Sequence, residues 1–423
     1  MRHSLKHSRK HSLKHSLKDS APTLRRATRL ALAAAVFLAL AAQAGETPDD
    51  GVYKDHIDWG VMMDMSGPAS ASQSVWARGF ETYLKKVNDA GGINGRKVNV
   101  LLEDDRFDMA QFRINFDKLS GQTPVLGISG MGNSSGQVAL LPSIKRGKVP
   151  VLGTYVTAKP AIEPPLPQYY AGFCGFREMA MVGVGTFSDK LGLKSPKIAT
   201  VHLDTASGKE YVAFVDEAVA KRGGTNTTIP IKVTASDATP QVLEIIKIKP
   251  DLIAIHGVVP TAVLLMRALK QYGVSTPAFA ISYLGTPGVY NALGPEVGAN
   301  YNFVSCFTPA SADDTAGTRE MSAAADKYGF GPMKDDINFV AGWSIGQLAA
   351  EAISKAGPEP TREKLIELLS KGFEVDTRGA SAPLKYTPEN HQGPVQLRAY
   401  TYDYSSKRFK AQGSYADSVK YVK

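Results

Sequence analysis

Short apolar runs alternate with amphipathic segments along most of the chain, beginning near residue 57. The apolar runs have the length of buried strands, and they lie at residues 59–63, 98–102, 125–128, 149–152, 198–202 and 252–255. Between them, segments such as 208–221, 241–248 and 261–272 repeat apolar residues at three- and four-residue spacing, which indicates helices. Strands that alternate with helices in this way are typical of parallel sheets covered on both faces. The pattern therefore predicts an α/β fold.

The stretch NDAGGINGRKVNVLLEDD at residues 88–105 lies where a predicted helix passes into a predicted strand. Gly91 or Gly92 can adopt the left-handed conformation that ends a helix without a steric penalty. Asn94 and Gly95 form a tight-turn pair that suits positive φ at both positions. Because apolar and polar residues alternate after them, we expect a helix, a turn and then a strand.

The alternation of strands and helices pauses at residues 163–175, which include PPLPQYY, and resumes at residue 179. We interpret the pause as the passage from a first to a second α/β lobe. Two further helices are predicted at residues 340–356 and 361–371, and residues 395–409 return to strand alternation. The chain is thus predicted to hold two α/β lobes.

Residues 1–44 have the pattern of a secretory signal peptide. Lys and Arg are frequent up to Arg29, an apolar run follows at residues 30–42, and Ala42 and Ala44 supply small residues at a cleavage site. The apolar run is shorter than the ~20 residues that a membrane-spanning helix needs. We therefore expect an exported, periplasmic protein.

Removal of this leader changes the charge balance. The chain holds 49 Lys and Arg and 40 Asp and Glu, of which the leader holds nine and one, so the other 379 residues carry 40 bases and 39 acids. This balance gives no indication of the clustered basic surface that nucleic-acid phosphates require, so no nucleic-acid partner is expected. A chain of this length is sufficient for two separate hydrophobic cores.

The candidate chemistry outside the leader is sparse. The chain has two cysteines, Cys174 and Cys306, and both follow the leader. From composition alone they form either one disulfide or two unpaired buried thiols. The histidines at 202, 256 and 391 lack metal-ligand spacing, and we identify no set of nucleophile, base and orienting residue. We expect no catalytic residue, no metal and no cofactor.

The glycine- and serine-rich loop at residues 130–136 follows a predicted strand and precedes a predicted helix. Ligands of α/β sheets bind beyond the carboxyl ends of strands, and the free N–H groups at a helix N-terminus favour an anion. Asn133 and Ser134 add neutral donors in this loop, and Tyr155 and Thr157 follow the end of the next strand. Helix capping is the alternative explanation for the serines.

Five motifs together identify a family resemblance. They are MSGPAS at 65–70, NDAGGINGRKV at 88–98, GMGNSSGQ at 130–137, VPVLGTYVTAKP at 149–160 and YTPENHQGPVQLRAYTYD at 386–403. In their order and spacing the chain resembles the type I periplasmic solute-binding proteins of ABC transporters, in the branched-chain amino acid (Leu/Ile/Val)-binding family. The resemblance extends over residues 52–410.

This resemblance implies two doubly wound parallel-sheet lobes joined by a three-segment hinge. The N-terminal lobe would comprise residues 50–173 plus 308–388, and the C-terminal lobe residues 177–304 plus 392–423. The hinge segments would lie near residues 173–176, 305–308 and 386–392. Because such segments run side by side in the family, the resemblance favours a disulfide between Cys174 and Cys306.

The resemblance also implies a ligand held in the cleft between the lobes. It assigns Asn133, Ser134, Tyr155 and Thr157 to the ligand carboxylate and Ser72 to the pocket wall. In the second lobe, relatives that bind amino acids have a tyrosine at the position of Ser207 and another near Val258 or Val259. Those relatives have an acidic residue near the sequence position of Tyr283. Tyr283, Val258 and Phe307 instead predict an apolar or aromatic wall in this chain.

The second lobe departs from the amino-acid pattern, because no Asp or Glu occurs between Asp251 and Glu296. A buried ammonium group without a counter-charge is costly, although Asp204 or Glu210 could provide one. We therefore predict the substrate-binding protein of an ABC importer, a monomer that binds a small hydrophobic or aromatic carboxylate and docks on permease subunits. The alternatives are a protein that binds branched-chain or other amino acids or amides, a ligand-sensing receptor domain, and a secreted α/β enzyme.

Overall fold

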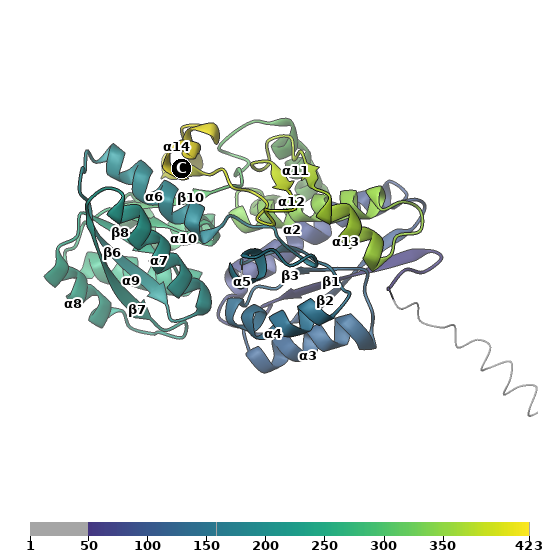
Figure 1. The fold of residues 1–423 in the computed structure, drawn as a ribbon. Coiled ribbons are helices and arrows are strands. Elements are labelled where there is room, and N and C mark those ends of the chain that lie inside the picture. Colours follow the sequence, from purple (N-terminus) through teal and green to yellow (C-terminus); the bar gives the residue numbers. More distant parts are fainter. Residues whose placement is uncertain (1–49, 158, 423) are drawn as a thin grey trace, which may run out of the picture. The chain divides into compact units, whose positions relative to one another are not determined.

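The computed structural model describes residues 50–157 and 159–422 (Figure 1). The predicted signal peptide lies outside the described residues. Within the described ranges, no helix has both the length and the apolar character needed to cross a membrane.

The first lobe is built on a five-stranded sheet whose strands are all parallel, in the order β2-β1-β3-β4-β5. Its strands are β1 (His56–Met63), β2 (Lys97–Asp104), β3 (Ile128–Gly130), β4 (Val151–Thr154) and β5 (Tyr169–Ala171). The connections contain α2 (Ser70–Asp89), α3 (Met109–Asp117), the π-helical turn η1 (Lys118–Gln122), α4 (Ser134–Arg146) and α5 (Lys159–Ile162). This arrangement confirms the predicted parallel α/β lobe.

Strand β1 is buried on both faces along its second half, which is why its sequence is continuously apolar from Trp59 to Met63 rather than alternating. Trp59 and Val61 belong to the core on the side of α2, whereas Met62 packs into a separate core with Phe112 and Leu140 of α3 and α4. Helices α3 and α4 accordingly cover one face of the sheet, and α2 covers the other (Figure 1).

The second lobe contains a seven-stranded sheet in the order β14-β13-β10-β9-β8-β6-β7. Its parallel strands are β6 (Lys197–Leu203), β7 (Thr225–Ile231), β8 (Leu252–Ile255), β9 (Ala278–Ala280) and β10 (Tyr301–Ser305). Its helices are α6 (Phe176–Lys190), α7 (Ala206–Ala220), α8 (Thr239–Ile248), α9 (Val259–Gln271), η2 (Ser282–Leu284) and α10 (Pro287–Gly298). The edge is an antiparallel hairpin of β13 (Arg398–Asp403) and β14 (Arg408–Gln412), so this sheet is not parallel throughout.

After β10 the chain contributes three α-helices, one 3₁₀ helix and a small two-stranded sheet before it reaches β13. These elements are α11 (Ala316–Lys327), η3 (Gly331–Met333), α12 (Ile337–Lys355), α13 (Arg362–Ser370), β11 (Phe373–Val375) and β12 (Leu384–Tyr386). Helix α12 packs closely along α2, because a Cβ atom at Gly79 or Gly342 would overlap with backbone atoms of the facing helix. The chain ends with η4 (Ala416–Ser418) and α14 (Val419–Val422).

The junction between α2 and β2 has the predicted conformation. Helix α2 ends at Asp89, and Gly91 and Gly92 follow with φ values of 102° and 79°. Asn94 and Gly95 also have positive φ, at 51° and 80°. The glycines therefore end the first crossover helix and turn the chain into the second strand.

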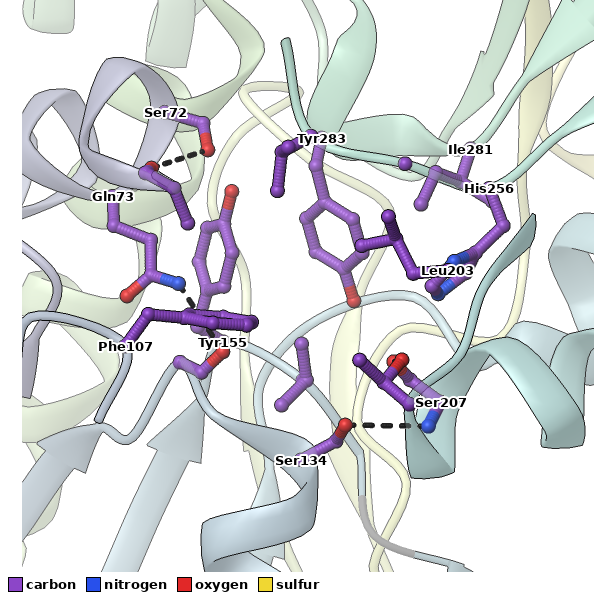
Figure 2. Close-up of a pocket in the computed structure, with 16 residues that line it drawn as sticks. Ser72, Gln73, Phe107, Ser134, Tyr155, Leu203, Ser207, His256, Ile281 and Tyr283 are labelled. Carbon is purple, nitrogen blue, oxygen red and sulfur yellow. Dashed lines mark hydrogen bonds between the residues drawn. The ribbon is translucent and has the colours of Figure 1, made fainter. Parts of the chain in front are cut away.

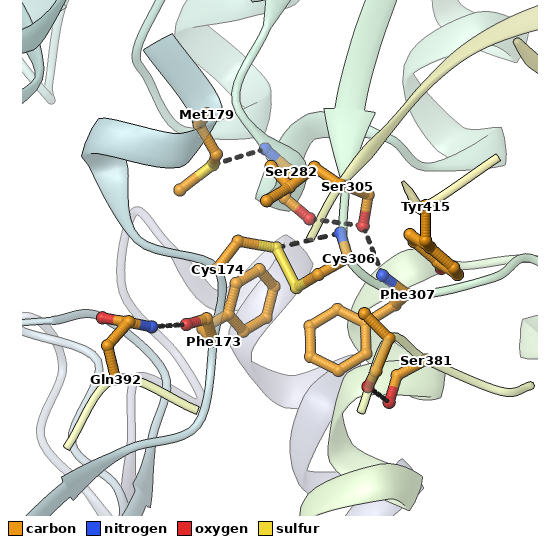
Figure 3. The surroundings of a disulfide bond; sticks show 12 residues. Phe173, Cys174, Met179, Ser282, Ser305, Cys306, Phe307, Ser381, Gln392 and Tyr415 are labelled. Carbon is orange, nitrogen blue, oxygen red and sulfur yellow. Dashed lines mark hydrogen bonds between the residues drawn. A yellow bond between two sulfur atoms is a disulfide. The ribbon is translucent and has the colours of Figure 1, made fainter. Parts of the chain in front are cut away.

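Three chain segments meet between the two sheets (Figure 3). Cys174 and Cys306 form a disulfide with a Cα–Cα distance of 5.8 Å, which joins the first segment to the second. The third segment contacts the first through Gln392, whose side-chain amide donates to the carbonyl oxygen of Phe173. These contacts hold the segments side by side.

Candidate functional site

A cavity of about 40 Å³ lies between the two sheets, and both lobes contribute to its wall (Figure 2). None of the sixteen described residues around it is Asp, Glu, Lys or Arg. They are Ala69, Ser72, Gln73, Phe107, Gly132, Ser134, Tyr155, Val156, Leu203, Thr205, Ser207, His256, Gly257, Val258, Ile281 and Tyr283. Most of them directly follow the carboxyl ends of parallel strands, which is where α/β sheets bind ligands.

The first lobe supplies the beginning of α2 and the loops that follow β2, β3 and β4. Gln73 on α2 is fixed in this wall, because its Oε1 accepts from the Asp64 N–H at 2.8 Å. Its Nε2 also donates to the Gly132 carbonyl at 3.1 Å. Phe107 lies in the cavity wall with φ of 57°, in the left-handed region that a bulky residue rarely occupies.

The two lobes contact each other where the N-termini of α4 and α7 meet. The Ser207 N–H donates to Ser134 Oγ at 3.2 Å, and the Ala206 N–H donates to Ser135 Oγ at 3.4 Å. The first N–H groups of a helix have no partner within the helix, and the helix dipole places partial positive charge there. Two such termini at one cavity form a region that attracts an anion.

Aromatic contacts cross the same cleft. The rings of Tyr155 and Tyr283 lie 4.7 Å apart between centroids. Asn338 connects them further, because it accepts from the Tyr155 hydroxyl at 2.7 Å and donates to the Tyr283 carbonyl at 3.1 Å. Burial raises the pKa of both phenols, so both stay neutral at physiological pH.

His256 is the only histidine among the cavity-lining residues, and it is 3% exposed. Burial, assisted by repulsion from His202, lowers the pKa of its imidazole to about 3. The side chain is therefore neutral at any pH near 7. Together with the tyrosines, it makes the cavity a polar but uncharged environment.

Six of the nine ligand-binding residues predicted from the sequence line this cavity: Ser72, Ser134, Tyr155, Ser207, Val258 and Tyr283. The structure does not bring Asn133, Thr157 or Phe307 to it.

Each of these three side chains has another role. Asn133 caps α4, accepting from the Gly136 N–H at 2.9 Å. Thr157 donates to Gln392 Oε1 at 3.0 Å in the third crossing segment. The ring of Phe307 packs against Phe173, with centroids 4.8 Å apart.

Sequence reasoning did not select several cavity residues, among them Gln73, Phe107, Leu203 and His256. Their positions relative to the strands are the sequence signal that could identify them as cavity residues. Gln73 directly follows the predicted Ser72, and His256 directly follows β8. Phe107 comes after β2, and no motif in the sequence predicts a ligand-binding loop at that strand end.

A second and larger cavity of about 360 Å³ lies near the crossing segments and is lined by Thr157, Gln392 and several charged residues. Glu210 is one of them; burial raises the pKa of its carboxyl to about 7, and the Lys159 N–H donates to it. Asp204 lies at neither cavity and pairs with Lys209 at 3.0 Å on the surface. Within the described ranges, no cluster of three His, Cys, Asp or Glu side chains is arranged to hold a metal ion.

Comparison with known proteins agrees with this architecture. The family model described as "Periplasmic binding protein" matches residues 57–408. A protein of Brucella abortus (strain 2308) named Leu/Ile/Val-binding protein homolog 1 is 24% identical over 318 residues, which are 74% of this chain and 82% of the relative.

Two solved structures share the fold. A fatty acid ABC transporter substrate-binding protein from Thermomonospora curvata has a TM-score of 0.76 at 20% identity, with 86% of this chain and 94% of that chain covered. A solute-binding protein from Rhodopseudomonas palustris BisB5, in complex with 3,4-dihydroxybenzoic acid, has a TM-score of 0.72 at 19% identity, with coverage of 85% and 97%. On the family match, which spans most of its length, the chain belongs to the periplasmic binding proteins, and it shares the fold of solved members that bind branched-chain amino acids.

Proposed function

We propose that this protein binds a small hydrophobic or aromatic carboxylate in the cleft between its lobes and delivers it, unchanged, to the permease of an ABC importer. One observation carries the proposal: the N-termini of α4 and α7 meet at a cavity that, among the described residues, is lined by no Asp, Glu, Lys or Arg. Such a site stabilises an anion through N–H groups, hydroxyls and helix dipoles.

The ligand carboxylate is placed at Ser134 and Ser207. In the structure, the Ser207 N–H already donates to an oxygen, Ser134 Oγ. A carboxylate oxygen is a stronger acceptor than a hydroxyl, because hydrogen bonds to ionised groups are roughly twice as strong as neutral ones. The incoming carboxylate therefore takes over this N–H, and the Ser134 hydroxyl turns to donate to it.

The wall of the cavity argues against an α-amino acid as the preferred ligand. Neither acid that could balance an ammonium group lines it: Asp204 is exposed and paired with Lys209, and Glu210 lines the other cavity. The names of the similar proteins mention branched-chain amino acids, a fatty acid and a dihydroxybenzoic acid, all of which carry a carboxylate. A carboxylate with an apolar body fits both observations.

The hydrogen-bond partners of the cavity's serine hydroxyls support transport of the ligand rather than its chemical conversion. Ser72 Oγ donates to the Ala69 carbonyl at 3.1 Å, and the Ser207 hydroxyl contacts Thr205 Oγ1 at 3.0 Å. A nucleophilic serine instead requires a base within hydrogen-bond reach. The only imidazole of the cavity, that of His256, makes no hydrogen bond to any described serine.

Binding requires motion of the lobes. A volume of about 40 Å³ corresponds to about three water molecules, far below the ~300 Å³ of a typical small-molecule pocket. A ligand the size of benzoate must therefore enter while the lobes are further apart and bend about the three crossing segments. That motion is the event a permease can recognise.

The test is calorimetric titration of the purified, exported protein with benzoate, leucine and benzamide. We expect benzoate to bind more tightly than either, because leucine adds an uncompensated ammonium and benzamide lacks the charge. Ser134→Ala should weaken benzoate binding by about 1–3 kcal/mol, which is about 5- to 150-fold. Ser354→Ala, at an exposed position of α12, is the matched control. Tighter binding of leucine, or unchanged benzoate affinity in Ser134→Ala, would refute the proposal.

A further inference from the structure

Two buried polar atoms in the second-lobe wall of the cavity have no hydrogen-bond partner. They are the hydroxyl oxygen of Tyr283, a residue 5% exposed, and Nδ1 of His256, a residue 3% exposed. Both residues line the cavity, and Figure 2 shows the Tyr283 hydroxyl pointing into the space that the labelled residues surround. Buried polar groups are nearly always paired, so two unpaired groups at one cavity point to a ligand.

No other side chain of the described residues pairs with Nδ1 of His256. Its nearest aromatic neighbours are Phe176 and Tyr211, with centroids 5.5 Å and 5.8 Å away. The hydroxyl of Tyr211 is itself unpaired and does not line the cavity. The backbone fixes the position, because the His256 N–H donates to the Val201 carbonyl at 2.9 Å.

Tyr283 is held in a similar way, by its ring and backbone rather than by its hydroxyl. Its ring lies 4.4 Å from that of Phe173 and 4.7 Å from that of Tyr155. Its carbonyl accepts from Asn338. The equivalent hydroxyl of Tyr155 is already bonded to Asn338, whereas that of Tyr283 is not bonded. Position and orientation are therefore set without the hydroxyl, which remains available to a ligand.

We propose that His256 and Tyr283 bind a neutral hydroxyl or carbonyl group of the ligand, separate from its carboxylate. This inference rests on the proposed function and specifies its ligand further, as a carboxylic acid that carries a hydroxyl or carbonyl substituent on an apolar body. It assigns the specificity for that substituent to the second lobe and the binding of the carboxylate to the junction of α4 and α7.

The donors and acceptors of the pair match such a substituent. A neutral imidazole has one donor and one acceptor nitrogen, and a phenol both donates and accepts. A ligand hydroxyl can thus accept from one group and donate to the other, and a carbonyl can accept from both. An ammonium group could only donate, and it would bring a charge that no side chain of this cavity balances.

The experiment compares benzoate with 2-, 3- and 4-hydroxybenzoate by calorimetric titration of the full exported protein. We expect the best of the hydroxybenzoates to bind at least about tenfold more tightly than benzoate, because it satisfies polar groups that benzoate leaves unpaired. Tyr283→Phe and His256→Leu should each reduce this ratio to near one, because each removes a group that would pair with the added hydroxyl.

Tyr211→Phe is the matched control, because it removes a buried, unpaired hydroxyl that does not line the cavity. It should leave the ratio unchanged. Equal binding of benzoate and all three hydroxybenzoates by the wild type would overturn the inference, as would a preference that survives both Tyr283→Phe and His256→Leu. In those cases benzoate still binds and the proposed function stands. A protein that binds none of the four acids overturns the proposed function itself.

Discussion

The disulfide between Cys174 and Cys306 should contribute much of the stability of the second lobe. The two cysteines are 132 residues apart in sequence, and the loop between them contains all five parallel strands of the second sheet. Replacement of both by alanine opens this loop in the unfolded state. Both cysteine side chains are fully buried, and the smaller alanine fits at both positions without a steric clash.

The magnitude follows from the entropy of closing the loop. For a separation of 132 residues, the chain-entropy relation gives about 5 kcal/mol at 25 °C. Residual structure in the unfolded chain reduces this value, and loss of the hydrogen bond from the Cys306 N–H to Cys174 Sγ, 3.0 Å long, adds to it. We expect a net loss of about 3–5 kcal/mol, a large fraction of the ~5–15 kcal/mol by which folded proteins are stable.

Urea unfolding followed by circular dichroism measures this loss as a lower midpoint for the double variant. Wild-type protein unfolded in the presence of a reductant is the control, and its midpoint should move to that of the variant. Benzoate affinity should change little, because neither cysteine lines the cavity. A midpoint that differs from the oxidised wild type by less than the equivalent of about 1 kcal/mol would refute the loop-entropy reasoning.

Three further predictions concern single residues. Burial raises the pKa of Asp105 to about 7 from the ordinary 3.8, so the folded state binds an extra proton between these two pH values. The stability of the folded state therefore falls as pH rises through that window, by at most about 4 kcal/mol. Asp105→Asn cannot ionise, so urea unfolding should find this variant more stable than the wild type at pH 8 but not at pH 4, and an equal difference at both pH values would contradict the raised pKa. In Gly132→Ala, the new Cβ would overlap with the carboxamide of Gln73 and displace it from the cavity wall, so calorimetry should find benzoate binding weakened by about 1–3 kcal/mol. Thr157→Ala should leave benzoate affinity within about twofold, because Thr157 bonds to Gln392 instead of lining the cavity; a large loss would place it in the site.

The fold was predictable because its elements have strong local patterns. The apolar run at β1 and the glycines after α2 each allow one local structure, and both have the predicted form. For the antiparallel hairpin of β13 and β14, the sequence predicts strand alternation but not the pairing of the strands. Its pairing with β10 depends on where the third crossing segment enters the sheet, and that position is set by contacts distant in sequence, such as those of Gln392.

The candidate site was predictable only to the level of strand ends. A strand end determines which edge of the sheet a residue occupies, but it does not determine which way the side chain turns. Thr157 and Tyr155 follow the same strand, yet one bonds to the third crossing segment and the other lines the cavity. The position of Phe107 depends on a left-handed backbone that a bulky residue rarely adopts, so no local propensity indicates it.

Under the proposed function, closure of the lobes and binding of the carboxylate use the same N–H groups. In the structure, the Ser207 and Ala206 N–H groups donate to the hydroxyls of Ser134 and Ser135, so the junction of α4 and α7 is held by neutral hydrogen bonds. A carboxylate that replaces these hydroxyls contacts both helix N-termini at once, and its charge-assisted bonds are the stronger ones. It therefore gains this interaction fully only when the lobes are together. A ligand shifts a conformational equilibrium only by its difference in affinity for the two states, and the shared N–H groups provide that difference here.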